Sequence, residues 1–223
     1  MRSKKYQEIK KKIEEDKIYS LDEAIDFIKR NARKTFDETV EVHLKLNLSS
    51  TSKSFGHLVS LPSGSYKKTR IAAFVSKELV SEAKEAGADI VGGEELIEKI
   101  KGKGEINFEK VVASPQVMSK LVKIAKILGP RGLMPDPKKG EVTEKIKEAI
   151  ERIKGGEIFY KADKGGNIHL GLAKVSWEKE RIKMNVEAFL ESVEKTGLKG
   201  LKESFIKQAV LSTSMGPGLK IKI

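Results

Sequence analysis

The sequence contains no cysteine, only three histidines and no long apolar run. Without cysteine, disulfides, thiolate metal sites and thiol nucleophiles are excluded. The histidines, His43, His57 and His169, are scattered along the chain, which argues against a zinc site. No apolar stretch approaches the ~20 residues that span a bilayer, and the first residues lack the apolar core of a signal peptide. We therefore expect no cofactor, no membrane contact, and a location in the cytosol or an equivalent compartment.

Positive charge is what the sequence has in excess. The 223 residues carry a formal net charge of +12, and 39% of them are hydrophobic, enough to build a sizeable core. A surplus of lysine and arginine is typical of proteins that bind phosphates and release their counterions. Charge alone does not identify the partner, but it favours a nucleic acid.

Both ends of the chain show patterns of half-buried secondary structure. Ser20 and Glu23 have the spacing of a capping box before an amphipathic helix. Strict alternation over residues 39–48 predicts a strand with one apolar and one polar face. Near the other end, "EIFYKA" and "NIHLGLAKV" flank "DKGG" and predict a hairpin, and a long amphipathic helix and two further strands follow.

The middle of the chain has a different pattern of apolar residues. "RIAAFV", "ADIV" and "KVVAS" are short, almost wholly apolar strands, each followed by a helical pattern, which is typical of βα units around a buried parallel sheet. Ser114 with Pro115 predicts one helix start, and Thr143 predicts the cap of the last helix, which Gly155 and Gly156 end. This block should form a three-layer α/β unit.

These patterns predict an α/β and α+β protein of two domains. Residues 1–67 and 157–223 should form one split α+β domain from both termini, and residues 68–156 an inserted α/β domain. Because the chain would cross between the domains twice, two adjacent linkers would act as a hinge.

No stretch resembles an active site. "LGPRGLMP" is neither a dinucleotide-binding nor a P-loop motif, and it follows a predicted helix rather than a strand. No serine, histidine and acid share a recognisable motif, so we predict that the protein is not an enzyme. The rigid, basic loop from Gly129 to Gly140 offers Arg131 and Lys138 as possible secondary anion contacts, although a purely structural turn explains it equally well.

The closing segment "LSTSMGPGLKIKI" is unusual for a strand. Ser212 and Ser214 should lie on the opposite face from Thr213 and Met215, and glycines such as Gly216 would let another backbone approach closely. Hydroxyl groups, exposed amides and a polarizable Met suit a ribose-rich RNA surface. The alternative is a strained edge turn with Met215 in the core.

Five stretches, "FDETVEVHLKL", "EAGADIVGGEELIEKI", "ILGPRGLMPDPKKGEVT", "DKGGNIH" and "LSTSMGPGLKI", resemble in this order the bacterial-type L-one family of large-subunit ribosomal proteins. The resemblance covers nearly the whole chain and implies the split architecture with a Rossmann-like insert. It implies a structural role at the mobile stalk near the tRNA exit site, with large-subunit rRNA, the leader of the protein's own mRNA and exit-site tRNA as partners. It also implies release of deacylated tRNA, translational repression, and a free protein that is a monomer.

The resemblance also implies an RNA-binding site in the split domain. Phe36 would pack on a sugar or base, Thr39 and Glu41 would bond ribose or base edges, and the hairpin would reach the backbone. Phe36 as a core residue and the polar strand positions as a solvated face are the alternatives. The full implied set is Phe36, Thr39, Glu41, Lys164, Gly165, Gly166, Asn167, Ser212, Ser214, Met215 and Gly216.

Four departures from the family pattern affect this expectation. Ser214 stands where the family usually has Thr, and Thr35 replaces a commonly basic residue. Asp136 and Lys139 stand where the family usually has Asn and often Thr, and Asp136 adds negative charge to the loop that would face an anion. Two other functions remain open at this point: a regulator of RNA or DNA outside the ribosome, and a nucleotide-binding or small-molecule-binding protein that uses the insert.

Overall fold

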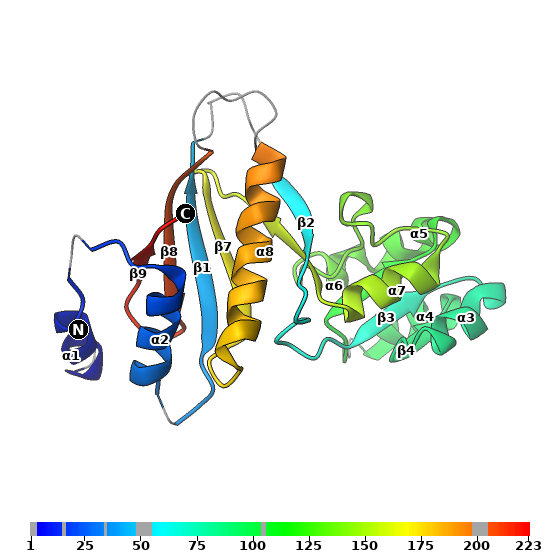
Figure 1. Cartoon of the computed structure of the whole chain (residues 1–223). Helices are drawn as coiled ribbons and strands as arrows, with labels where there is room; N and C mark the ends of the chain where they lie inside the picture. The colour runs from blue at the N-terminus through cyan, green and yellow to red at the C-terminus, as the bar shows by residue number, and fades with distance from the viewer. Residues whose placement is uncertain (1–3, 15–16, 34, 48–54, 104–105, 198–204) are drawn as a thin grey trace. The chain divides into compact units, whose positions relative to one another are not determined.

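The computed structural model describes residues 4–14, 17–33, 35–47, 55–103, 106–197 and 205–223. The chain divides into two compact units (Figure 1): unit 1 comprises Met1–Tyr66 and Gly156–Ile223, and unit 2 comprises Lys67–Gly155. Unit 1 mixes helices with antiparallel sheets, and unit 2 surrounds a parallel sheet with helices. The predicted fold class is confirmed.

Unit 1 is built on a sheet in the order β7-β1-β8-β9, in which neighbouring strands are antiparallel. A separate two-stranded sheet pairs β2 with β6. The elements of the unit are α1 (Lys4–Lys11), α2 (Leu21–Asn31), β1 (Thr39–Leu46), β2 (Gly56–Ser60), β6 (Glu157–Lys161), β7 (Asn167–Lys174), α8 (Lys179–Gly197), β8 (Ile206–Thr213) and β9 (Leu219–Ile221).

The alternation in β1 divides the sheet into a buried and an uncovered face. Val40, Val42, Leu44 and Leu46 are at most 3% exposed and join one hydrophobic core with the apolar sides of α2 and α8. Figure 1 shows both helices on the same face of the sheet. Each buried aliphatic side chain contributes about 1.5–3 kcal/mol, so this packing determines which face of the sheet stays open.

The capping box at the start of α2 is present. The Ser20 hydroxyl accepts a hydrogen bond from the Glu23 N–H at 3.3 Å, and the Glu23 carboxylate accepts one from the Ser20 N–H at 3.0 Å. We expect Ser20→Ala to lower the free energy of unfolding by about 0.5–2 kcal/mol, measured by urea denaturation, because one of the two bonds is lost. Ser20→Thr keeps the hydroxyl and should lose much less; equal losses in the two variants would contradict a capping role.

The predicted hairpin around "DKGG" is wrong. The turn itself closes, because Asp163 N–H donates to the Asn167 carbonyl at 2.8 Å and Gly166 has φ +75°. Beyond the turn the two strands separate: β6 pairs with β2, whereas β7 pairs with β1 in the larger sheet. Pairing partners from distant parts of the chain outcompete the local hairpin.

Unit 2 is a three-layer structure. Its parallel sheet has the order β4-β3-β5, one core cluster lies on each face, and helices cover both. The α-helices and strands are β3 (Ile71–Phe74), α3 (Val80–Glu85), β4 (Ile90–Gly92), α4 (Glu94–Lys103), β5 (Lys110–Ala113), α5 (Pro115–Leu121), α6 (Ala125–Leu128) and α7 (Ile146–Lys154), and short 3₁₀ turns are η1 (Lys77–Leu79), η2 (Val122–Ile124) and η3 (Pro137–Lys139).

Of the two helix starts predicted in unit 2, the cap at Thr143 is wrong and the start at Ser114 and Pro115 is confirmed. Lys145, not Thr143, is the N-cap of α7, and the Thr143 hydroxyl instead accepts from the Lys145 N–H at 3.1 Å. Ser114 is the N-cap of α5 and Pro115 its first residue, as predicted, although the buried Ser114 hydroxyl makes no capping bond and has no partner among the described residues. The sequence pattern located both helices, but packing determined which side chains bond their ends.

Within unit 1, the two chain segments that lead to unit 2 lie side by side. Leu61 N–H donates to the Gly156 carbonyl at 3.2 Å, and a Cβ on Gly156 would lie 2.8 Å from the backbone of Gly64. Gly156 also has φ +100°, a conformation that L side chains rarely adopt. Only glycine satisfies both conditions there, so this residue fixes how closely the two segments approach.

Candidate nucleic-acid interface

The uncovered face of the four-stranded sheet carries most of the polar residues singled out above. We call this surface the polar sheet face. Pairing places Glu41 opposite Ser212, His43 opposite His169, and Lys45 opposite Asn167. Its members are Thr39, Glu41, His43 and Lys45 of β1, Asn167 and His169 of β7, and Ser212 of β8.

At one end of the polar sheet face, the segment after β8 is bonded to the start of β1. Thr39 N–H donates to the Ser214 hydroxyl at 3.1 Å, and Ser214 N–H donates to the Thr39 carbonyl at 3.1 Å. The Thr39 hydroxyl also accepts from the Lys174 ammonium at 2.9 Å. These bonds fix the position of Ser214. The Ser214 hydroxyl, at a position where the family usually has Thr, therefore accepts a hydrogen bond from the protein's own backbone.

Two large apolar side chains are exposed next to this junction. Phe36 is 46% and Met215 is 47% exposed. Neither lies in the core, so the interpretation of Met215 as a buried residue is wrong. A Cβ on Gly216 would lie 2.4 Å from the Thr213 hydroxyl oxygen, so even alanine would displace that side chain. An exposed apolar side chain next to a tightly packed glycine, as at Met215 and Gly216, offers a surface on which a base or sugar can lie flat.

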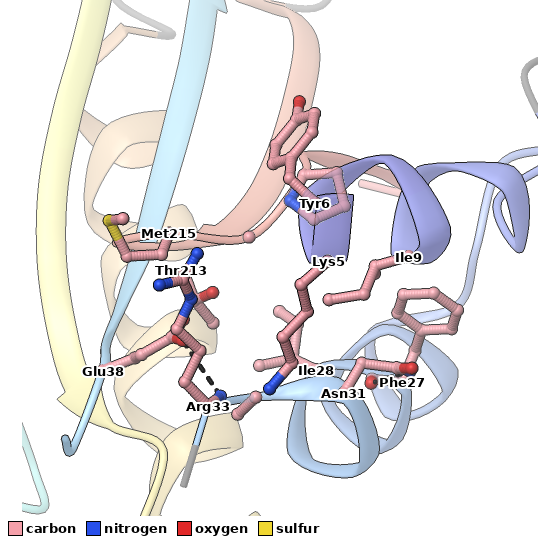
Figure 2. A pocket seen from close by; sticks show the side chains of 13 residues that line it. Lys5, Tyr6, Ile9, Phe27, Ile28, Asn31, Arg33, Glu38, Thr213 and Met215 are labelled. Atoms are coloured by element: carbon pink, nitrogen blue, oxygen red, sulfur yellow. Dashed lines mark hydrogen bonds between the residues drawn. The ribbon is translucent and has the colours of Figure 1, made fainter. Parts of the chain in front are cut away.

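Behind Met215 lies a small hollow bounded by α1, α2 and the end of β8 (Figure 2). Its volume is about 20 Å³, which accommodates about one water molecule and no nucleotide. Glu38, only 2% exposed, accepts a hydrogen bond from the Arg33 N–H at 3.0 Å, and its other carboxylate oxygen has no partner among the described residues. Met215 lines one side of the hollow, and the hollow is too small to bind a ligand larger than water.

The centre of the polar sheet face is a chain of hydrogen bonds across three strands. The Nδ1 atoms of His43 and His169 are 2.8 Å apart, and His43 Nε2 lies 2.9 Å from the Ser212 hydroxyl. Partial burial, and then the neighbouring His169, lower the pKa of His43, while Glu41 at 3.9 Å acts in the opposite direction. Ser212 is only 8% exposed, so its main partner in the free protein is His43.

At the other end of the polar sheet face, the β6–β7 turn is held by Asp163. Its carboxylate accepts from the Asn167 backbone at 2.7 Å and from the Asn167 amide at 3.0 Å, and these bonds lower the pKa of Asp163. Lys45 donates to the Gly165 carbonyl at 2.6 Å, and Leu46 N–H donates to the carbonyl of the buried Gly166. Lys164 at the tip of the turn is exposed.

Most predicted RNA contacts therefore lie along β1 and at its two ends, but Gly166 is buried and Ser212 is only 8% exposed. From Thr39 to Lys45, β1 spans ~20 Å at ~3.3 Å per residue, with Met215 beside its first residue and Lys164 near its last. The possible secondary contacts, Arg131 and Lys138, belong to unit 2, where both side chains are exposed.

Sequence reasoning missed two functional candidates on this surface. His43 and His169 were treated only as scattered histidines, although they are paired across β1 and β7. The alternation in each strand places both side chains on polar faces, but only the strand register, which the sequence pattern does not give, brings them together.

Across the described ranges, no group of three or more acidic or histidine side chains is arranged to hold a metal ion. None of the helices in the part of the chain that the structure describes combines the length and apolarity needed to cross a bilayer.

Comparison with known proteins agrees with the resemblance. The sequence model of the "Ribosomal protein L1p/L10e family" matches residues 28–217. Proteins named "Large ribosomal subunit protein uL1" from Fervidobacterium nodosum and Mycoplasma capricolum are each 42% identical, over 223 and 222 residues. The alignments cover 99% of this chain in both cases, and 95% and 98% of the relatives. The chain belongs to the ribosomal protein L1p/L10e family.

Proposed function

We propose that this protein is a structural component of the large ribosomal subunit that binds ribosomal RNA through the polar sheet face and the segment Ser214–Gly216. The observation that carries the proposal is the open sheet face, which has hydroxyl, amide and imidazole groups along ~20 Å and exposed Phe36 and Met215 at one end. RNA, unlike DNA, offers 2′-hydroxyl groups to such a surface. The relatives named above are large-subunit proteins, which supports the same assignment.

The charge of the protein supports the proposal without determining specificity. A net charge of +12 attracts any polyanion, and that attraction weakens as salt concentration rises, because releasing counterions into a more concentrated solution is less favourable. A shaped surface should instead retain its preference for RNA at higher salt. Selectivity between nucleic acids, rather than affinity alone, is therefore the property to measure.

The test is a titration against three ligands at two salt concentrations: an rRNA fragment of the stalk, its DNA counterpart and an unrelated RNA hairpin. We expect the rRNA fragment to bind far more tightly than the other two and to keep that preference at the higher salt. Equal binding of all three, lost together as salt rises, would mean that only net charge is at work.

We further propose that the same surface binds the leader of the protein's own mRNA and represses translation, and that the protein in the ribosome aids release of deacylated tRNA from the exit site. These roles follow from the family resemblance. A leader RNA that competes with the rRNA fragment for one site would support a shared surface, and simultaneous binding of both would contradict it.

A further inference from the structure

The His43–His169 pair can accept one additional proton but not two. A nitrogen–nitrogen distance of 2.8 Å is a hydrogen bond, which requires one ring to donate and the other to accept. With both rings neutral, a single hydrogen lies between the two Nδ1 atoms. One added proton can bind to a free Nε2 atom and leaves this hydrogen bond intact. A second added proton would have to bind to the accepting Nδ1 atom, so that two N–H groups would face each other and the bond would be lost. The pair therefore behaves as a one-proton unit.

Protonation changes what the pair presents to a ligand. In the singly protonated pair, both outer Nε2 atoms carry hydrogen. The Nε2–H of His43 then donates to the Ser212 hydroxyl, 2.9 Å away, while that of His169 faces outward from an exposed side chain. The protonated pair thus combines a positive charge with an outward-facing donor, the combination that binds phosphate oxygens.

The charged groups around the pair have mixed signs. On β1, Glu41 lies 3.9 Å from His43 Nε2 and Lys45 follows on the same face. From the β6–β7 turn, Asp163 interacts electrostatically with His169. On the far side of β8, Lys220 of β9 pairs with Val210. Burial and the second imidazole lower the pKa of His43, which favours the neutral form of this ring in the free protein.

We propose that the His43–His169 pair is an additional subsite of the RNA interface, which contacts a phosphate through His169 Nε2 and takes up one proton when RNA binds. This proposal rests on the proposed RNA-binding function. A phosphate beside His169 favours the charged pair, so the pair has a higher pKa in the complex than in the free protein. The added affinity is then fully present below the pKa of the free pair and is lost as pH rises through the pKa of the complex.

The test measures the affinity for the stalk rRNA fragment at several values between about pH 5.5 and 8, the range in which histidine titrates. The wild-type protein should bind more tightly as pH falls, by up to about tenfold if RNA raises the pKa of the pair by one unit. His169→Gln keeps a polar side chain without a titrating group and should lose this pH dependence. His57→Gln is the matched control, because His57 lies exposed on β2 in the other sheet of unit 1.

A second readout is independent of affinity. Imidazole NMR signals should show that the free pair gains one proton over this range, and that it does so at higher pH in the complex. An unchanged pH dependence in His169→Gln, or none in the wild type, would overturn the subsite. Failure of the wild type to bind RNA selectively at any pH would instead refute the proposed function, and the subsite with it.

Discussion

Phe189→Ala is expected to lower the free energy of unfolding of unit 1 by about 3–5 kcal/mol. Phe189 lies on α8 with no exposed surface, and its ring meets that of Tyr160 edge to face, with centroids 5.3 Å apart. Removing the ring leaves a cavity between the helix and both sheets of the unit. Because α8 covers the face opposite the polar sheet face, the loss should reduce stability without altering the polar sheet face directly.

Denaturant titration followed by tryptophan fluorescence measures this loss selectively. Trp177 is the only tryptophan and lies in unit 1, so its signal reports on this unit even if the two units unfold separately. Met184→Ala, on the same helix but 48% exposed, is the control and should change stability by less than about 0.5 kcal/mol. Similar losses in the two variants would mean that α8 is not packed as described.

Met215→Ala is expected to weaken binding of the stalk rRNA fragment by about 1–3 kcal/mol, a factor of roughly 5–150 in Kd. The side chain is 47% exposed and lies outside the core, so it should contribute to binding and little to stability. Phe36→Ala should have an effect of similar size for the same reason.

Met184→Ala again provides a matched control, since Met184 is exposed to almost the same degree, 48%, but lies on the helix that covers the opposite face. Affinities for all three variants come from one titration series at fixed salt, with circular dichroism to verify folding. Normal affinity in folded Met215→Ala and Phe36→Ala would remove both residues from the proposed site.

Local features of unit 1 could be predicted from the sequence because they depend on neighbouring residues. The alternation in β1 and the capping box at Ser20 are both present as predicted. The resemblance to the L-one family is likewise confirmed, and because that family consists of structural proteins, so is the prediction that the chain is not an enzyme. The strand alternation and the capping box involve only residues of one strand or one helical turn, so they can be read from neighbouring residues without knowing any distant contact.

Features that depend on distant contacts could not be predicted in the same way. The "DKGG" segment forms a turn, but the pairing of its flanking strands is decided by β1 and β2, more than a hundred residues earlier in the chain. The contact between His43 and His169 joins residues 126 positions apart, and a shift of one residue in register would send His169 to the other face. No local periodicity contains that information.

The position of β1 between β7 and β8 also affects how the protein forms as it is synthesised. Unit 2 is encoded by one continuous stretch and can complete its contacts early, whereas β1 must wait for partners from the last third of the chain. Bringing together strands so far apart in the sequence is slow, and until β7 and β8 are synthesised β1 has unpaired backbone N–H and C=O groups. The polar sheet face is thus assembled at the end of synthesis, so a truncated chain would contain a finished unit 2 but would lack the proposed RNA interface.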